Sequence, residues 1–335
     1  MNDKIDFVIT WVDGNDPAWR ESRDRYAALE HLDIGGDDAR YRDWDLLRYC
    51  FRSIEKFAPW VNRVFFVTCG HHPGWLDLDN PRLHIVSHKE FIPEKYLPTF
   101  NSNVIEFWLH KIQGLSEQFV YFNDDIFLLA PVAPSRFFKD GLPCDLGGMT
   151  FNLHDGMFGA TVLNSRTLVN RHFDKRTVIH DAPSKWINLH DLPVSFMNLL
   201  LLFVRKHEFT GFVNPHLSQA FLKNSFERVW ANCEKDLQRS CSNRFRDYSD
   251  LAFWLVRYWQ LASNQFSPFN VKKDGQYFLM DDGNLQDIVN CIRRQKKRII
   301  CLNDSDRISD FEAAREMIRN AFDSILPGKS SFEIA

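Results

Sequence analysis

The stretch Ile5 to Val12 (IDFVITWV) is a short apolar run rich in β-branched residues, and it ends abruptly in the polar sequence Asp13 to Pro17 (DGNDP). This pattern is typical of a buried β-strand that leads into a loop. Three further runs repeat the pattern, each bounded by polar, Gly or Pro residues: Arg63 to Thr68, Leu83 to Ser87 and Phe119 to Phe122.

Helical patterns separate these runs. Apolar residues recur at spacings of three and four between Leu46 and Phe57, and Asn103 with Glu106 resembles a capping box that opens a helix through Ile112. Strands that alternate with helices predict an α/β fold with a mostly parallel, doubly wound, Rossmann-like sheet. Such a sheet binds its ligand at the carboxyl ends of its strands. The polar residues that follow the predicted strands are Asp13, Asp16, Gly70 and the triplet Asn123-Asp124-Asp125.

The composition is that of a folded, aromatic-rich chain of 335 residues, 44% of them hydrophobic and 25% charged. We expect a Rossmann-like core over residues 1–182. Residues 183–265, rich in Leu, Phe and Trp, are expected to form a helical insertion lobe. Residues 266–328 should return to the core sheet and end in a helix that Ser309 and Glu312 open. Residues 329–335 are expected to be a flexible tail.

Charge and cysteine content limit the partners and the compartment. The net charge of -3 is too near neutral to attract nucleic acid in bulk, so we expect no nucleic-acid partner. The seven cysteines form no CxxC pair, which is typical of reduced thiols, and the first residues show no apolar signal-peptide core. The most apolar stretch, Leu199 to Val204, is far shorter than a membrane span. These features predict a cytoplasmic protein.

The Asn123-Asp124-Asp125 triplet is the first candidate site. Two adjacent carboxylates at the end of a buried strand repel each other unless a cation or hydrogen-bond donors compensate them. A divalent ion that bridges a diphosphate is a natural compensator. A solvated loop or a helix cap is the simpler explanation of an isolated pair, but the buried strand before this pair favours a metal. The turn residues Asp13 and Asp16, and Asn303-Asp304 after a late strand, are expected to lie at the same rim.

Cations and a histidine interrupt the apolar second half. His216 alone is most simply structural, and Arg244 and Arg246, which precede Asp247 and Asp250, are most simply paired internally. The segment Trp186 to Lys206 is most simply a buried helix, and the alternative is a helix at a membrane surface. The basic run Arg293 to Arg298 is most simply the solvated end of a helix, and the alternative is a contact with anionic headgroups.

Several blocks in order along the chain resemble the conserved blocks of the Stealth family, which comprises capsular polysaccharide hexose-1-phosphate transferases and the catalytic core of the lysosomal-enzyme GlcNAc-1-phosphotransferase. These blocks are Asp6 to Asp16, Leu47 to Tyr49 with Arg52 to Glu55 and Ala58 to Val61, Leu97 to Ser102, Asn123 to Asp125, Pro215-His216 and Cys301 to Asp304. The resemblance implies a glycosyltransferase-A-related sheet with a helical insertion, in agreement with the pattern of strands and helices.

The activity that the resemblance implies is transfer of a hexose 1-phosphate or N-acetylhexosamine 1-phosphate from a nucleotide sugar, expected to be UDP-linked, to a glycan hydroxyl. A nucleoside monophosphate leaves. The implied acceptor is an oligo- or polysaccharide that can be lipid-linked, met at the inner face of the cytoplasmic membrane. The alternative is a metal-dependent glycosyltransferase that releases a nucleoside diphosphate, and a non-catalytic saccharide-binding protein is a further one.

Site residues are carried over by position. The implied catalytic residues are Asp124, His216 and Arg246, and the identity of the general base stays open between His216 and the aspartates. The implied ligands of Mg²⁺ or Mn²⁺ are Asp124, Asp125 and Asp304. The implied substrate-binding residues are Asp13, Asp16, Asn101, Arg244 and Asn303.

Overall fold

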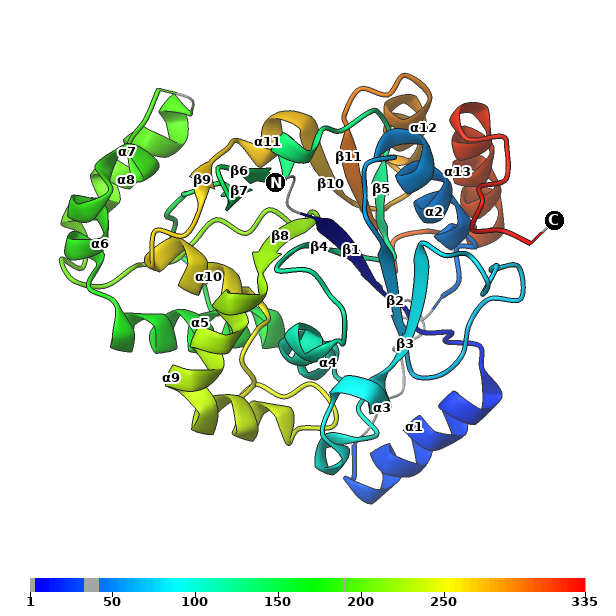
Figure 1. The fold of residues 1–335 in the computed structure, drawn as a ribbon, viewed down its shortest axis with the longest axis horizontal. Helices are drawn as coiled ribbons and strands as arrows, with labels where there is room; N and C mark the ends of the chain where they lie inside the picture. The colour runs from blue at the N-terminus through cyan, green and yellow to red at the C-terminus, as the bar shows by residue number, and fades with distance from the viewer. Residues whose placement is uncertain (1–3, 33–41, 190, 335) are drawn as a thin grey trace.

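A central five-stranded sheet forms the middle of the molecule in this computed structural model, which describes residues 4–32, 42–189 and 191–334 (Figure 1). Its strand order is β3-β2-β1-β4-β8. The first four strands in space are parallel and β8 runs antiparallel at the edge beside β4. The bounds are β1 (Ile5–Thr10), β2 (Val64–Thr68), β3 (Leu83–Ser87), β4 (Gln118–Asn123) and β8 (Gln219–Leu222). The mostly parallel α/β architecture predicted from the sequence is confirmed.

Both faces of this sheet are covered, which is why its strands read as continuous apolar runs. Phe7 and Ile9 point into a core shared with three helices, whereas Val8 points into a core on the other face. The first group comprises α2 (Leu47–Phe57), α12 (Leu285–Arg293) and α13 (Phe311–Ile325); the second comprises α4 (Ser102–Trp108), α5 (Gly156–His172), α9 (Lys223–Cys241) and α10 (Trp254–Ala262).

The C-terminal strands do not rejoin the central sheet as expected for residues 266–328. Instead β10 (Gly275–Leu279), β11 (Ile299–Asn303) and β5 (Ile126–Leu128) form a separate three-stranded sheet. β11 pairs antiparallel with β5, which directly follows β4 and the acidic triplet. The C-terminal sheet therefore brings Asn303 to the same rim as Asp125 by another route.

The helical lobe begins earlier than residue 183 and is not a separate unit. Its helices start with α5, and its strand β8 pairs with β4 of the central sheet. Arg257 of α10 is wholly buried and donates two hydrogen bonds to Asp145, which ends strand β7 (Leu142–Asp145). The remaining lobe helices are α6 (Lys175–Asp181), α7 (Pro183–Trp186) and α8 (Leu192–Phe203).

Short elements connect these layers. They are α1 (Pro17–Leu29), α3 (His88–Phe91), α11 (Val271–Asp274), the 3₁₀ turns η2 (Glu94–Tyr96), η3 (Leu109–Lys111) and η4 (Pro134–Arg136), and a small sheet of β6 (Phe138–Lys139), β7 (Leu142–Asp145) and β9 (Ser267–Pro268). No helix within the described ranges is long and apolar enough to cross a membrane. All seven cysteines are free thiols.

The expected flexible tail is instead packed onto the core as far as the structure describes it. Phe332 is wholly buried, and Glu333 accepts two hydrogen bonds from Arg52 at 2.7 and 2.8 Å. Asn80 also donates to the backbone carbonyl of Ser331. The short length of the segment concealed this docking, because a single aromatic anchor and one bidentate ion pair hold it.

Candidate active site

The carboxyl ends of β1 and β4 open into one large cleft of about 900 Å³. Thr10 and Asn123 are register partners, so the loops that follow these strands begin side by side. Seven of the ten predicted site residues have their place in the cleft wall, namely Asp13, Asp124, Asp125, His216, Arg246, Asn303 and Asp304. Asp16, Asn101 and Arg244 do not line it.

Asp124 and Asp125 form the acidic centre of the cleft. Asp124 is exposed to the solvent of the cleft, but the surrounding protein partly desolvates its carboxylate. This desolvation and, to a smaller extent, the negative charges of Asp125 and Asp43 raise the pKa of Asp124 to about 7. Burial also raises the pKa of Asp125. Two neighbouring carboxylates that are costly to ionise are a site where a cation is strongly stabilising.

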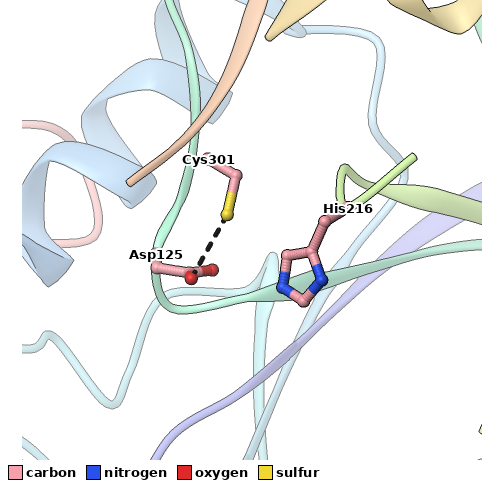
Figure 2. A group of neighbouring side chains, drawn as sticks. All are labelled: Asp125, His216 and Cys301. Atoms are coloured by element: carbon pink, nitrogen blue, oxygen red, sulfur yellow. Dashed lines mark hydrogen bonds between the residues drawn. The ribbon is translucent and has the colours of Figure 1, made fainter. Parts of the chain in front are cut away.

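The side chains of Asp125, Cys301 and His216 point toward one another, as Figure 2 shows. The Cys301 thiol donates to Asp125 Oδ2 at 3.2 Å, while the buried Oδ1 of the same carboxylate has no hydrogen-bond partner within the described ranges. The carboxylate, imidazole and thiol each offer one atom within 4.8 Å of the others. Burial and Asp125 raise the pKa of Cys301 far above its usual range, so the thiol keeps its proton as a donor.

This arrangement fits a divalent cation on two grounds. The buried Asp125 Oδ1 has no hydrogen-bond partner among the described residues, and carboxylate oxygens suit Mn²⁺ or, with water, Mg²⁺. Within the described ranges, this is the group of three ligand-bearing side chains that the geometry brings together, and it contains neither Asp124 nor Asp304.

Asp304, expected to be a metal ligand, forms an ion pair with Arg42. Arg42 donates to both of its carboxylate oxygens at 2.9 and 2.7 Å, and the Ser305 backbone N–H adds a third hydrogen bond. The guanidinium neutralises Asp304 and fixes the loop after β11 against the segment before α2. Leu302 also donates its N–H to the Asp125 carbonyl, which joins β11 to the acidic loop. Asn303 follows at the cleft wall.

The two aspartates after β1 have different positions. Asp13 lines the cleft, whereas Asp16 caps α1 by accepting from the N–H groups of Ala18 and Trp19. Backbone hydrogen bonding from Trp19 is the main reason that the pKa of Asp16 is lowered. Its other oxygen lies 3.1 Å from His71 Nδ1, so the turn chemistry of the sequence becomes a helix cap.

The predicted arginines divide in the same way. Arg246 lines the cleft and donates to Ser102 Oγ at 2.7 Å. Arg244 points elsewhere: it donates to the Pro98 carbonyl at 2.8 Å, and its guanidinium lies 4.4 Å from the centre of the Tyr26 ring. Asn101 is fully buried and donates to Asp250 at 2.7 Å. The hydrogen bonds of Asn101 and Arg244 therefore attach the loop that contains Arg246 to the core.

Glu106 is a cleft residue that the sequence analysis assigned to a helix cap. Asn101, not Asn103, caps α4, and Glu106 is buried with its carboxyl 2.7 Å from the Tyr121 hydroxyl. Burial raises its pKa to about 7, against the opposing effects of Tyr121 and Arg246. Arg42, Asp43 and Arg307 also line the cleft and were not singled out, because nothing in their local sequence separates them from ordinary surface charges.

A mostly parallel sheet whose strand ends gather carboxylates, a histidine and an arginine in one cleft is typical of an α/β enzyme that binds its substrate at the strand ends. Three conserved regions of the Stealth proteins match this chain: region 1 over residues 3–28, region 2 over 40–144 and region 4 over 290–335. His216 and Arg246 lie outside these three matches.

Full-length relatives have the same character. The capsular polysaccharide phosphotransferase WcwK of Streptococcus pneumoniae is 37% identical, with 99% of this chain and 100% of the relative covered. The receptor polysaccharide phosphotransferase WefC of Streptococcus gordonii is 37% identical over the whole of both chains. The exopolysaccharide phosphotransferase cps2G of Lactiplantibacillus plantarum is 38% identical, with 98% and 96% covered. The chain belongs to the Stealth family and is a phosphotransferase.

Among solved structures, the galactosyltransferase LgtC in complex with donor and acceptor sugar analogues aligns with 96% of each chain, at 10% sequence identity and a TM-score of 0.43.

Proposed function

We propose that this enzyme transfers a hexose 1-phosphate or N-acetylhexosamine 1-phosphate from a nucleotide sugar to a hydroxyl group of a growing cell-surface polysaccharide. The observation that supports this proposal is the meeting of the Asp124-Asp125 pair with His216 and Arg246 in one cleft. A diphosphate needs cationic contacts along its length, and an attacking hydroxyl needs a proton acceptor. The relatives named above act on capsular, receptor and exopolysaccharides, which favours a glycan acceptor.

The reaction forms one bond at phosphorus and breaks another. The acceptor oxygen attacks the phosphorus that bears the sugar, and the bond from that phosphorus to the bridging oxygen of the nucleotide breaks. The sugar phosphate becomes a phosphodiester and a nucleoside monophosphate leaves. Catalysis of such a step depends on positioning and on charge stabilisation.

The cleft residues have separate roles in this proposal. His216 accepts the proton of the acceptor hydroxyl, and Arg246, held by Ser102, binds a nonbridging phosphate oxygen. Asp13 and Asn303, which both line the cleft, orient the donor. Asp125 would hold Mg²⁺ or Mn²⁺ with the negative charge of Asp124 beside it, and the ion supplies positive charge to the diphosphate when bound. Asp304 contributes through its pairing with Arg42 rather than as a metal ligand.

The finer identity of both substrates belongs to the same proposal. The donor is proposed to be UDP-linked, because the resemblance stated above implies a uridine nucleotide sugar. The acceptor is proposed to be a lipid-linked oligosaccharide that the enzyme meets in the cytoplasm, at the inner face of the membrane.

Product analysis tests the reaction. Purified enzyme is incubated with Mn²⁺, a panel of nucleotide sugars and an oligosaccharide acceptor, and the products are separated and weighed by mass spectrometry. A nucleoside monophosphate together with an acceptor heavier by one sugar phosphate supports the proposal. A nucleoside diphosphate with an acceptor heavier by one sugar would identify a glycosyltransferase instead, and the absence of turnover across the panel would favour a saccharide-binding protein.

A further inference from the structure

Helix α8 presents its apolar residues to water. Phe196, Leu200 and Phe203 are 62%, 49% and 72% exposed. Leu192, Met197 and Leu199 on the same helix are also exposed, and so are the neighbouring Ile187, Leu189 and Val204. The simplest interpretation of this segment, a buried helix of the lobe, is therefore wrong. The buried apolar residues of this segment are Trp186, which precedes the helix, and Leu201 on its inner face.

The polar residues of α8 face the protein. Ser195 and Asn198 are buried, and Asn198 accepts from the Met149 N–H and donates to the carbonyls of Gly147 and Trp186 at 2.6–2.7 Å. Ser195 exchanges two hydrogen bonds with the backbone of Asn188. A surface helix of a water-soluble domain normally has the opposite arrangement, with its apolar stripe toward the core.

Lys175 fixes the end of this helix. Its buried ammonium donates to the carbonyls of Leu201 and Arg205 at 2.8 and 2.9 Å, and also to that of Val204. Asp191 caps the other end by accepting from the Val194 N–H. Both ends and the inner face are thus held by hydrogen bonds, so the exposed apolar face belongs to a well-anchored helix.

Basic side chains gather at the end of the apolar face. Arg205 and Lys206 follow α8 directly and are exposed, and the Lys175 N–H donates to the His207 carbonyl, which places exposed Arg176 beside the same turn. Glu208 offsets part of this charge by pairing with Arg205. An apolar helix face with phenylalanines and a basic border is complementary to a bilayer surface that carries anionic headgroups.

We propose that the exposed face of α8 is a membrane-docking surface that inserts into the interface of an anionic phospholipid bilayer. Twelve residues at about 1.5 Å each give a helix of about 18 Å, which suits a helix that lies in the plane of the interface. The surface goes beyond the proposed chemistry and does not depend on which group the enzyme transfers.

The basic run Arg293 to Arg298 is not part of this surface. It comprises the last residue of α12 and the turn after it, and α12 lies on the opposite side of the molecule from α8 along the long axis (Figure 1). Two of its side chains are also engaged: Lys297 donates to the carbonyls of Lys272 and Lys273, and Arg298 donates to that of Pro131. This cluster therefore supplies a control for nonspecific attraction to charged vesicles.

The test is sedimentation of the purified full-length protein with vesicles of phosphatidylcholine, with and without phosphatidylglycerol. We expect salt-sensitive binding to the anionic vesicles. The triple variant Phe196→Gln, Leu200→Gln, Phe203→Gln should bind at least about tenfold more weakly, and Arg176→Gln with Lys206→Gln should weaken binding to anionic vesicles only. Leu29→Gln with Leu78→Gln removes two exposed leucines elsewhere and should bind as the unaltered protein does.

Three results would overturn the proposal. They are no sedimentation of the unaltered protein with either vesicle, equal binding by the triple variant, and loss of binding when Arg293 and Arg294 are changed to Gln while the triple variant binds normally. Light scattering after size exclusion gives a fourth outcome. If the unaltered protein is a dimer that does not bind vesicles and the triple variant is a monomer, this face is a contact between two copies of the chain. That result would also overturn the proposal.

Discussion

The imidazole of His71 accepts a hydrogen bond from the backbone N–H of Asp13 at 2.8 Å. Its other nitrogen, Nδ1, lies 3.1 Å from the Asp16 carboxylate, which favours a ring whose proton sits on Nδ1. One side chain from the loop after β2 therefore ties both aspartates of the loop after β1. This contact holds Asp13 at the cleft wall while Asp16 caps α1.

Loss of this contact should weaken donor binding more than it weakens folding. We predict that His71→Ala raises the KM for the nucleotide sugar about tenfold with a small change in kcat, because the Asp13 loop loses its anchor. Steady-state kinetics and thermal melting measure both effects. His72→Ala, a change at the exposed neighbouring histidine, is the control and should behave normally. An unchanged KM in His71→Ala would contradict the anchoring role.

The sequence predicted those parts of the fold that depend on local pattern. The run Leu83 to Ser87 is found as β3 with the same bounds, and the helix predicted to start near Leu46 is α2, because buried strands and amphipathic helices have distinct periodicities. The separate sheet of β5, β10 and β11 was missed, since a pairing between strands more than 150 residues apart leaves no local signal.

The sequence predicted which loops form the candidate site but not which side chains of those loops point into the cleft. Asp124, Asp125, His216 and Arg246 do meet in one cleft. The same kind of residue at Asn101 turned out to be buried among backbone carbonyls, because side-chain direction depends on tertiary packing. Charged residues whose partners are distant in sequence, such as Arg42 beside Asp304, were equally invisible.

The acidic pair should govern cation binding. We predict that Asp125→Asn and Asp124→Asn each lower the transfer rate at least about a hundredfold and weaken Mn²⁺ binding, because both carboxylates line the cleft and Asp125 Oδ1 lacks a partner. Mn²⁺ binding is followed by electron paramagnetic resonance without substrates, and transfer is assayed with and without EDTA. Asp79→Asn, at an exposed acid outside the cleft, is the control. Full activity in chelator would contradict the metal assignment.

The two arginines of one loop should separate chemistry from stability. We predict that Arg246→Ala and His216→Ala lower kcat at least about a hundredfold with little change in melting temperature, since both line the open cleft. Arg244→Ala should instead lower the melting temperature, because Arg244 hydrogen-bonds the Pro98 carbonyl and stacks on Tyr26. If Arg246→Ala lowers the melting temperature strongly and Arg244→Ala leaves it unchanged, the catalytic role of Arg246 is contradicted.

Glu106 lines the cleft and belongs to a hydrogen-bond network centred on Tyr121. The Tyr121 hydroxyl is 2.7 Å from Glu106 Oε1, 2.7 Å from Asn123 Oδ1 and 2.9 Å from the Thr10 hydroxyl. A tyrosine has one proton to donate, so the Tyr121 hydroxyl donates to either Glu106 or Asn123 at one time. Burial raises the pKa of Glu106 to about 7, against the opposing effect of the hydrogen bond from Tyr121.

The pH dependence of stability follows from this shift. The Glu106 pKa rises from 4.5 to about 7 on folding, so between these pH values the folded chain holds a proton that the unfolded chain has released. The free energy of unfolding therefore falls as pH rises through this window.

Glu106→Gln removes the ionisable group. We predict that the stability of this variant relative to the unaltered protein improves from pH 5 to pH 8, by about 1.4 kcal/mol for each unit of the pKa shift. Urea unfolding at both pH values measures the difference. Glu94→Gln, at an exposed position, should show no such change, and parallel pH profiles for Glu106→Gln and the unaltered protein would mean that Glu106 is already ionised in the folded chain.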